Sequence, residues 1–498
     1  MAMLGKRRPP RQHSGHSGLA RSAPAVPASK PSVLDEAVGA DSVTIERLAH
    51  DGRGVAHLAS GKTVFVDHAL PGEQGVIAVH RNRKRYDEAH LKSVTHASTQ
   101  RTTPICEHFG HCGGCDLQHL AVTAQRDHKR QVIKELFARQ GITVDVPIEL
   151  LAGESDAYRR RARLGVKVDG DGRVLLGFRA RHSHRLVDIK GCPVLVPPLQ
   201  ALLAPLREHL ERLQAPRYIG HIELIATAET SMVVVRQLRE HLHDKACWER
   251  FAAEHGVVLG TWLGRETPEL HWHGAPPHLV DRLGEVALSF QPGDFLQVNA
   301  EVNRQMVATV SEWLAGEPGQ CVLDLFAGIG NFSLPLAAQG AHVHAVEGSA
   351  AMVERLQANA SANRLDVSAE QVDLSQLQAV EALLCHSGEA NSAPGARPVV
   401  ERDGGSHGAW NGSWNSSWNR AWNSVVVDPP RSGAESVCRA LSRRPPPRVV
   451  YVSCDPATLA RDAAQLVHAG YRIARMAVAD MFVHTAHMET LVLFEHSG

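Results

Sequence analysis

Short runs in which apolar and polar residues alternate fill the chain just after residue 42. Four segments within about 55 residues, separated by turn-forming Gly, Pro and Asp, predict five strands: SVTIERL, GVAHL, TVFVDHAL and GVIAVHRNRKRYDEAHLKSV. Five short strands at this spacing favour a small β-barrel of the oligonucleotide-binding kind. Arg81, Arg83, Lys84 and Arg85 beside Tyr86 suit contact with an RNA backbone and its bases, although a solvated edge strand explains the same residues.

The pattern changes twice more along the chain. From about Phe290, apolar strands of four to six residues alternate with helical periodicity, which predicts an α/β domain with a parallel sheet over residues 291–498. The barrel then occupies residues 36–94, and residues 95–290 form a mixed α+β central domain. Two segments lack periodicity: a basic tail over residues 1–35, and a low-complexity insertion over residues 385–424 that contains WNGSWNSSWNRAWN.

Composition adds limits on the class of protein. The 498 residues are 43% hydrophobic and 21% charged, which suits a globular chain with more than one core. No apolar stretch approaches the roughly 18 residues of a transmembrane helix, and the N-terminus does not resemble a secretory signal. Nine unevenly placed cysteines do not make a disulfide framework. We therefore expect a cytoplasmic protein with no membrane contact.

Charge is segregated although the formal net charge is zero. Residues 1–34, 76–103 and 158–185 carry net charges of +6, +4 and +7, so the rest of the chain is acidic. Such segregation indicates local contact with a polyanion. In residues 158–181, basic and apolar residues alternate as in a strand pair with one basic face.

Three cysteines cluster as C-x5-C-x2-C in ICEHFGHCGGCDLQH, and a fourth stands in KGCPVL. Cys106, Cys112, Cys115 and Cys192 are therefore candidate ligands of one soft-metal site, with Gly113 and Gly114 allowing a tight loop. The spacing leaves a structural Zn²⁺ and a [4Fe–4S] cluster equally open, and unrelated buried thiols remain an alternative.

A nucleoside cofactor is indicated by QCVLDLFAGIGNFSLPLA, residues 320–337. Asp324 ends the strand, and Gly328 and Gly330 let the backbone approach a ligand. The next strand ends in Glu347, where an acid commonly holds ribose hydroxyls. The turn lacks the third glycine of a dinucleotide site, so it favours S-adenosylmethionine, which has no phosphate.

Strand ends also carry the candidate catalytic residues. SVVVDPPRSG places Asp428 after a buried strand, RVVYVSCDPATLARD places Cys454 after the next, and Glu489 precedes the last strand. In an open parallel sheet, ligands gather at the carboxyl ends of strands. Cys454 lies near a helix N-terminus, which predicts thiolate character, while a buried structural cysteine is an equal alternative on position alone.

Uracil explains why a thiolate would stand beside an S-adenosylmethionine site. Its C5 is too weak a nucleophile to take a methyl group unaided, but a thiolate that adds at C6 converts the ring into an enolate. After methyl transfer a base must remove the C5 proton, and Glu489 is the candidate for that base.

These motifs together resemble the uracil-C5 RNA methyltransferases, in particular the branch that acts on 23S ribosomal RNA and has an N-terminal TRAM barrel and a [4Fe–4S] cluster. The resemblance covers about residues 36–498 without the insertion, and rests on CEHFGHCGGC, FLQVN, DLFAGIGNF, VDPPRSG, VSCDPATLARD and HMETLVLF. It implies a Rossmann-like class I methyltransferase domain, a TRAM barrel and a cluster-bearing central domain. Leu296 departs from the family, where an aromatic residue is usual.

The resemblance also implies roles for individual residues. Cys454 corresponds to the nucleophile and Glu489 to the base, and Cys106, Cys112, Cys115 and Cys192 correspond to the cluster ligands. The residues implied to contact S-adenosylmethionine are Gln297, Phe326, Asn331, Glu347, Asp373 and Asp428.

The implied substrate is a uridine of 23S ribosomal RNA that leaves its stack to reach Cys454, with the barrel and the arginine runs holding the surrounding RNA. We expect a monomer. Two alternatives stay open: a transfer-RNA uracil-C5 methyltransferase, and an RNA-binding iron–sulfur protein without catalysis.

Overall fold

A computed structural model describes residues 42–181, 183–316, 319–385 and 422–497. The predicted tail (1–35) and most of the predicted insertion (385–424) lie outside these residues. No helix in these four ranges is long and apolar enough to cross a membrane.

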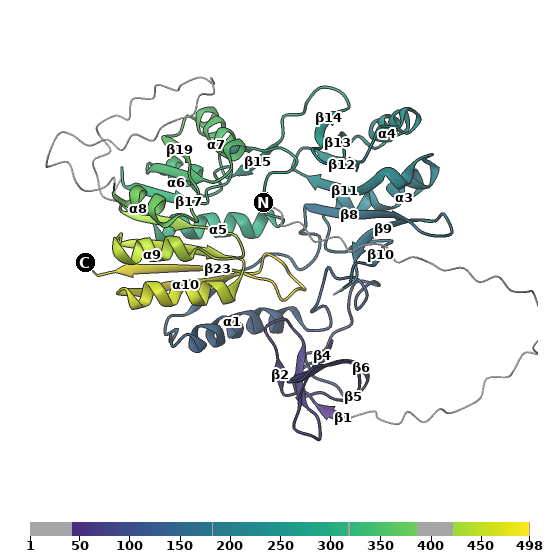
Figure 1. The fold of residues 1–498 in the computed structure, drawn as a ribbon, viewed down its shortest axis with the longest axis horizontal. Helices are drawn as coiled ribbons and strands as arrows, with labels where there is room; N and C mark the ends of the chain where they lie inside the picture. Colours follow the sequence, from purple (N-terminus) through teal and green to yellow (C-terminus); the bar gives the residue numbers. More distant parts are fainter. Residues whose placement is uncertain (1–41, 182, 317–318, 386–421, 498) are drawn as a thin grey trace, which may run out of the picture. The chain divides into compact units, whose positions relative to one another are not determined.

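The first domain is a small sheet that curls on itself around a core of its own (Figure 1). Its strands, in the order β1-β5-β6-β4-β3-β2, are β1 (Ser42–Thr44), β2 (Arg47–Leu48), β3 (Gly54–His57), β4 (Thr63–Asp67), β5 (Gln74–Asn82) and β6 (Tyr86–His96). The prediction of five strands is wrong by one, because the first predicted strand is divided at Ile45 into β1, which pairs with β5, and β2, which pairs with β3. The N–H of Ile45 donates to Glu73 O, whereas the N–H of Glu46 donates to Val55 O.

The central domain is a seven-stranded sheet with helices on one face. Its strands, in the order β10-β9-β8-β11-β12-β13-β14, are β8 (Arg161–Val168), β9 (Val174–Arg179), β10 (Leu186–Asp188), β11 (Ile219–Ala226), β12 (Ser231–Gln237), β13 (Val258–Leu263) and β14 (Glu269–Trp272). The helices are α2 (Pro197–Ala201), α3 (Leu203–Arg212), α4 (Leu242–His255) and the 3₁₀ turn Pro216–Tyr218. The predicted strand pair is confirmed as β8 and β9, which pair antiparallel.

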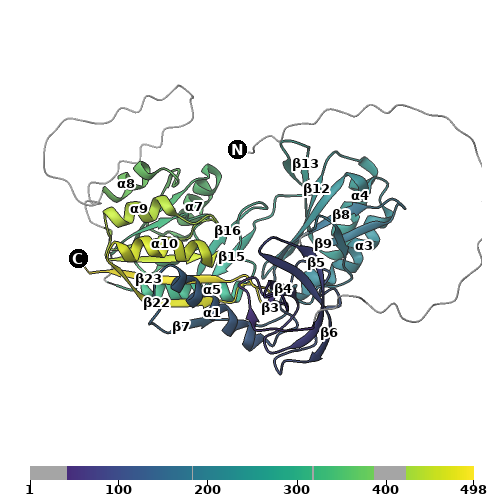
Figure 2. The same cartoon turned by 60° about the horizontal axis from the view of Figure 1, so that its bottom comes forward.

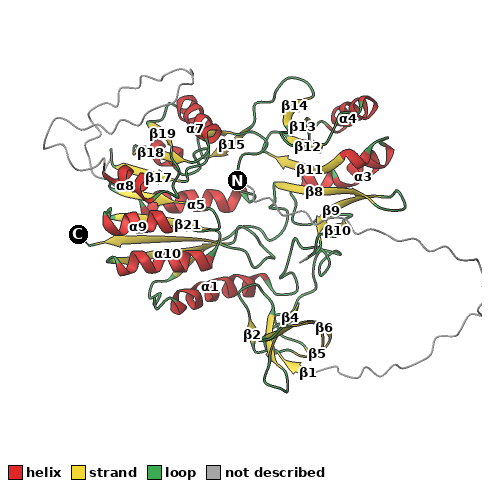
Figure 3. Cartoon of the chain, viewed as in Figure 1, coloured by secondary structure: helices red, strands yellow, loops and turns green. Residues whose placement is uncertain are grey.

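The third domain is an eight-stranded sheet with helices on both faces, shown by secondary structure in Figure 3. In the order β19-β18-β17-β20-β21-β23-β22-β7, its strands are β19 (Val367–Gln371), β18 (His342–Glu347), β17 (Cys321–Leu325), β20 (Ser424–Val427), β21 (Arg448–Ser453), β23 (Glu489–His496), β22 (Tyr471–Ala479) and β7 (Ile148–Leu151). The α/β prediction is confirmed. The sheet is not wholly parallel, however, because β23 pairs antiparallel with both β21 and β22.

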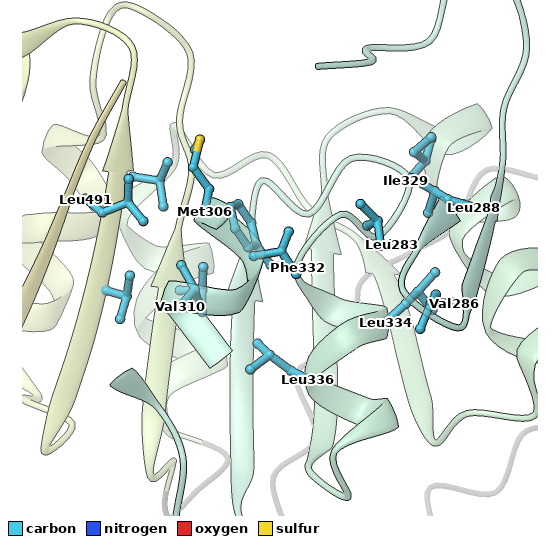
Figure 4. Close-up of a cluster of buried hydrophobic side chains, with 14 of the residues drawn as sticks. Leu283, Val286, Leu288, Met306, Val310, Ile329, Phe332, Leu334, Leu336 and Leu491 are labelled. Carbon is cyan, nitrogen blue, oxygen red and sulfur yellow. The ribbon is translucent and has the colours of Figure 1, made fainter. Parts of the chain in front are cut away.

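Alternate residues of each strand enter two separate apolar layers, which explains why the strands read as continuous apolar runs. On one face lie α5 (Ala300–Trp313), α6 (Ser333–Ala338), α7 (Ala350–Asn363) and the hairpin of β15 (Val280–Leu283) and β16 (Val286–Ser289). Figure 4 shows side chains of this layer from the hairpin, α5, the glycine turn, α6 and Leu491. On the other face α8 (Leu377–Cys385), α9 (Glu435–Arg443), α10 (Pro456–His468) and α1 (Val122–Arg139) are consecutive neighbours (Figure 2).

Two boundaries differ from the sequence prediction. Helix α1 and strand β7 precede residue 291, yet α1 belongs to the apolar layer of this sheet and β7 pairs with β22 at its edge. Trp422, the last tryptophan of the predicted insertion, also packs in that layer, and its indole N–H donates to Leu383 O at 3.0 Å. Apolar burial fixes both segments, and local composition does not reveal it.

Candidate active site and cysteine centre

The two candidate catalytic residues meet at the end of the large sheet that carries the carboxyl ends of its parallel strands. Cys454 follows the last residue of β21, and Glu489 is the first residue of β23, so the antiparallel pairing of these strands brings both to the same end. Asp428 follows β20, the other neighbour of β21. The charges of Glu489 and Asp428 both act on the Cys454 thiol. The three side chains therefore share one site.

The structure does not support the predicted thiolate character of Cys454 in the free protein. Burial, and then the charge of Glu489, raise the pKa of its thiol to about 11. The N-terminus of α10 does not compensate, because Asp455 caps it: Asp455 Oδ1 accepts the N–H groups of Ala457 and Thr458, both at 3.0 Å. Cys454 is therefore a thiol, and not a thiolate, in the free protein at neutral pH.

Glu489 is almost completely buried, with 4% of its surface exposed. Burial, followed by the charge of Asp428, raises the pKa of its carboxyl well above the usual range. The carboxyl of Asp428 has its pKa raised to about 7, first by burial and then by Asp324. This end of the sheet therefore holds acidic groups that retain protons near neutral pH, as a proton-transferring site requires.

Arg431 is a site residue to which sequence reasoning gave no role. It follows Asp428 in VDPPRSG, and its charge lowers the pKa values of both Cys454 and Glu489, against the effect of burial. It also lines the cavity into which the four cysteines open. Arg431 is thus a cation placed between the cysteine cavity and the Cys454–Glu489 pair.

The cofactor candidates surround a second, smaller cavity. Gln297, Phe326, Asn331 and Asp428 line a space of about 50 Å³ beside the glycine turn. A Cβ built at Gly328 would meet no atom within 4 Å, while one built at Gly330 would come within 2.9 Å of Leu334. Gly328 therefore leaves room for a ligand, and Gly330 permits close packing of α6 behind the turn.

Three of these residues are held by specific partners. Asn331 and the buried Asn303 exchange side-chain hydrogen bonds of 2.9 and 3.1 Å. Glu347 accepts the N–H of Gly328 at 3.1 Å and of Ser349 at 3.0 Å, so it fixes the glycine turn. The Gln297 carbonyl accepts Arg160 Nε at 2.9 Å. Asn303 and Arg160 are supporting residues that no motif spacing could have revealed.

Asp324 and Asp373 stand apart from this cavity. Asp324 is fully buried within β17 and accepts Ser333 Oγ at 2.5 Å, and burial raises its pKa to about 7. It ties the strand to α6 and does not face the ligand space. Asp373 is exposed after β19 and binds the N–H and hydroxyl of Ser375, which lower its pKa. The cavity-lining residues do not include it.

Cys106, Cys112, Cys115 and Cys192 open into one cavity of about 290 Å³. None of them forms a disulfide. Burial and the neighbouring thiols raise the pKa values of Cys115 and Cys192, to about 12 and about 11. Within the described ranges no three His, Cys, Asp or Glu side chains are close enough to hold a single metal ion. The sequence thus predicted the convergence of the four thiols on one space.

The arginine run of residues 159–163 is partly structural. Arg160 is buried and forms a bidentate ion pair with Asp281, in which its two terminal nitrogens donate to the two carboxylate oxygens at 2.5 and 2.7 Å. Arg161 pairs with Glu223 at 2.9 Å, while Arg163 remains exposed. The predicted basic face is therefore smaller than the charge count suggested, because Arg160 is paired with β15 and Arg161 with β11.

Comparisons with known proteins identify the class. Residues 42–92 match the TRAM domain model, and residues 282–385 and 417–497 match the model of tRNA (Uracil-5-)-methyltransferase. The fold is similar to that of the Pyrococcus abyssi tRNA (uracil-54, C5)-methyltransferase in complex with S-adenosyl-L-homocysteine. The TM-score is 0.67 over 91% of this chain and 99% of that one, at 23% identity. Fold and site together define a methyltransferase with a TRAM domain.

Full-length sequence similarity narrows the class to one family. The chain is 52% identical to the 23S rRNA (uracil(1939)-C(5))-methyltransferase RlmD of Halomonas elongata, over 100% of this chain and 97% of that protein. It is 40% identical to the protein of the same name from Aeromonas salmonicida, over 91% and 95%. The chain belongs to the family of 23S rRNA uracil-C5 methyltransferases.

Proposed function

We propose that this protein transfers a methyl group from S-adenosylmethionine to C5 of a uridine in 23S ribosomal RNA. The observation that carries the proposal is the meeting of Cys454 and Glu489 at the sheet edge next to the glycine-turn cavity. A nucleophile and a proton acceptor are the two groups that methylation at C5 of uracil needs beyond the methyl donor.

The chemistry proceeds in three steps. Cys454 Sγ adds to C6 of the uracil, and the electron pair of the C5–C6 bond moves into the ring carbonyl as an enolate. C5 then attacks the methyl carbon of the sulfonium, which leaves as S-adenosylhomocysteine. Glu489 accepts the C5 proton, and the returning electron pair expels the Cys454 thiolate. The proton that the Cys454 thiol gives up to solvent before it adds is regained by the expelled thiolate, so one proton, the one from C5, is released for each methyl group transferred.

The free protein is not yet in its reactive charge state, because the pKa of Cys454 is about 11 and that of Glu489 is raised. Both groups must therefore be adjusted when substrates bind. The sulfonium of the methyl donor brings a positive charge to the cavity lined by Asp428, whose negative charge raises both pKa values. Arg431 acts in the same direction as the bound sulfonium, towards the ionised forms.

Gln297, Phe326, Asn331, Glu347 and Asp428 are the residues we assign to the methyl donor, and Asp373 is assigned on the family pattern alone. The 50 Å³ of this cavity is smaller than a whole adenosyl group, so part of the ligand lies outside it, and we assign that part to Glu347, which accepts the N–H of Gly328. We assign the barrel, the central domain and its exposed arginines such as Arg163 to the surrounding RNA.

We infer that the cysteine centre holds a [4Fe–4S] cluster. Four thiols that open into one 290 Å³ cavity match the donor set of such a cluster, and the resemblance to the cluster-bearing branch of the family favours it over Zn²⁺. The cluster is structural in this proposal and takes no part in the methylation. Iron and sulfide analysis of anaerobically purified protein tests it: stoichiometric zinc in colourless protein would overturn the assignment.

Tritium release tests the function. Protein incubated with S-adenosylmethionine and [5-³H]uridine-labelled 23S RNA should release tritium to water, while labelled transfer RNA should not support release. Release from transfer RNA alone would show that transfer RNA, and not 23S RNA, is the substrate. Release from neither RNA would refute the proposed methyltransferase activity.

A further inference from the structure

The segment Asp480–Met488, called the connecting segment below, joins β22 to β23 and ends at Glu489. It is also a wall of the cysteine cavity, which is lined by Phe482, Thr485 and His487. The same nine residues therefore touch both the cysteine centre and the proposed base.

The start of the connecting segment is anchored to α1. Lys129 is fully buried, and its ammonium donates to Asp480 Oδ1 at 2.7 Å and to Phe482 O at 3.1 Å. Arg126 Nε donates to Asp480 Oδ2 at 2.9 Å. These bonds fix one end of the segment to a rigid helix.

The middle of the segment is held by the cysteine loop itself. Asp116 and Leu117, which directly follow Cys115, both donate their N–H groups to His484 O, at 2.8 and 2.9 Å. The buried Gln125 accepts the His484 N–H at 3.0 Å and donates to Leu117 O at 3.0 Å. His484 has a φ of 65°, a left-handed conformation that is uncommon for residues other than glycine and that marks the bend of the segment.

Tyr158 makes the second link. Its hydroxyl donates to Val483 O at 3.1 Å, and its ring packs with Val483 against Cys115 and Cys192. Two of the four cysteines are thus in apolar contact with the cluster of side chains that carries the segment.

We propose that the connecting segment transmits the occupancy of the cysteine centre to the position of Glu489, with Gln125 and Tyr158 as positioning residues. This inference rests on the proposed function. When the four thiols are held, Cys115 and Cys192 are fixed, and so are the two N–H groups on His484 O and the ring of Tyr158. When the thiols are released, the loop after Cys115 moves, and the segment loses the contacts that hold its bend. Loss of these contacts should therefore slow removal of the C5 proton by Glu489 and leave addition of Cys454 and methyl transfer unchanged.

Hydrogen–deuterium exchange tests the structural half of the proposal. The amides of residues 480–489 should exchange at least tenfold faster after iron is removed by chelation than in the loaded protein, while those of the glycine turn (328–332) should not change. Equal protection of residues 480–489 in both forms would overturn the proposal. If chelation speeds amide exchange throughout the chain, the protein has unfolded, and the proposal is then tested by the Tyr158→Phe experiment below, which uses loaded protein only.

Tyr158→Phe in the loaded protein tests the functional half. RNA that carries 5-fluorouridine forms the methylated adduct but cannot complete the reaction, because fluorine cannot leave as a cation. Adduct formation therefore reports Cys454 and methyl transfer, and turnover on ordinary RNA reports Glu489 in addition. Tyr158→Phe should slow turnover about fivefold to tenfold, as expected for one buried hydrogen bond, and leave the adduct-formation rate within about twofold.

Tyr471→Phe is the matched control, since Tyr471 is also buried and its hydroxyl also donates to a backbone carbonyl, Pro446 O, at 3.0 Å. Tyr471 is the first residue of β22, at the opposite end of the strand pairing from Glu489. It should leave both rates unchanged. Equal slowing of both rates in Tyr158→Phe, or the same slowing in Tyr471→Phe, would refute the positioning role. Absence of any adduct in the unaltered protein would instead refute the proposed function.

Discussion

Cys454 and Glu489 occupy the positions just beyond the last pair of the β21–β23 ladder, in which Ser453 faces Thr490. The two residues are 35 positions apart in the sequence, and only the antiparallel direction of β23 brings them together. If β23 ran parallel to β21, its first residue, Glu489, would lie at the opposite end of the strands from Cys454. The reversal of this single strand therefore creates the proposed catalytic pair.

Cys454→Ala should abolish both turnover and adduct formation with 5-fluorouridine RNA, because Cys454 is the thiol that lies beside Glu489 in the β21–β23 pairing and is the nucleophile of the proposed mechanism. Binding of S-adenosylhomocysteine, measured by calorimetry, should change by less than about threefold, since Cys454 does not line the glycine-turn cavity. Cys247→Ala, on α4 of the central domain, is the control and should retain full activity. Residual turnover in Cys454→Ala would contradict the nucleophile assignment.

Glu489→Gln should let the methylated adduct form and then persist on ordinary RNA. The amide fills the same buried space but cannot accept the C5 proton, so release of product should slow by about 10² to 10⁴-fold. Denaturing gels of enzyme mixed with labelled RNA and S-adenosylmethionine would show the accumulated adduct. A variant that turns over at the normal rate, with no adduct, would rule out this base.

Arg431→Ala should move the pH profile of adduct formation upwards. The positive charge of Arg431 lowers the pKa of Cys454, so its loss raises that pKa further above 11 and leaves less thiolate at neutral pH. A rise of one pKa unit corresponds to about a tenfold slower rate at pH 7. Arg431→Lys keeps the charge and should remain within about threefold. Identical profiles for the alanine and lysine variants would show that charge is not the cause.

Gly113→Ala should empty the cysteine centre, whereas Gly114→Ala should not. A Cβ at Gly113 would lie 2.9 Å from Arg179 O and 3.1 Å from Arg181 N, so the loop cannot keep its place beside β9. A Cβ at Gly114 would meet only Cys112 Sγ, at 3.4 Å. Iron content per chain measures the difference, and binding of S-adenosylhomocysteine checks that the large domain is intact. Full iron content in Gly113→Ala would disprove the steric argument.

Asp324→Asn should remove part of the pH dependence of stability. The pKa of Asp324 is raised to about 7 in the folded state, so the folded chain holds this proton more tightly than the unfolded chain does. Stability contributed by the proton is present at low pH and is lost as pH rises from about 4 to about 7. The free energy of unfolding of Asp324→Asn, relative to the unaltered chain, should therefore rise by about 4 kcal/mol over this range. A difference that does not depend on pH would contradict the raised pKa.

The cofactor turn and the cysteine loop were predictable because their residues are close in sequence. DLFAGIGNF contains the strand end, the glycines and Asn331, and CEHFGHCGGC contains three of the four thiols. Asn303 and the Arg160–Asp281 pair escaped prediction because each supports the site across a large sequence separation. The predicted thiolate character of Cys454 failed for a local reason, since the next residue, Asp455, already accepts two N–H groups at the start of α10.

The sequence by itself determined the elements and the chemical groups: the alternating and continuous apolar runs, the glycine turn, the thiols and the acids at strand ends. These follow from local periodicity and residue chemistry, which need no knowledge of distant neighbours. Tertiary structure alone decided that β23 runs against β21, that α1 and β7 complete the large sheet, and that the segment before Glu489 lines the cysteine cavity. The physical reason is that burial and strand pairing between distant segments set these relationships, and they also set the charge state of Cys454 and Glu489.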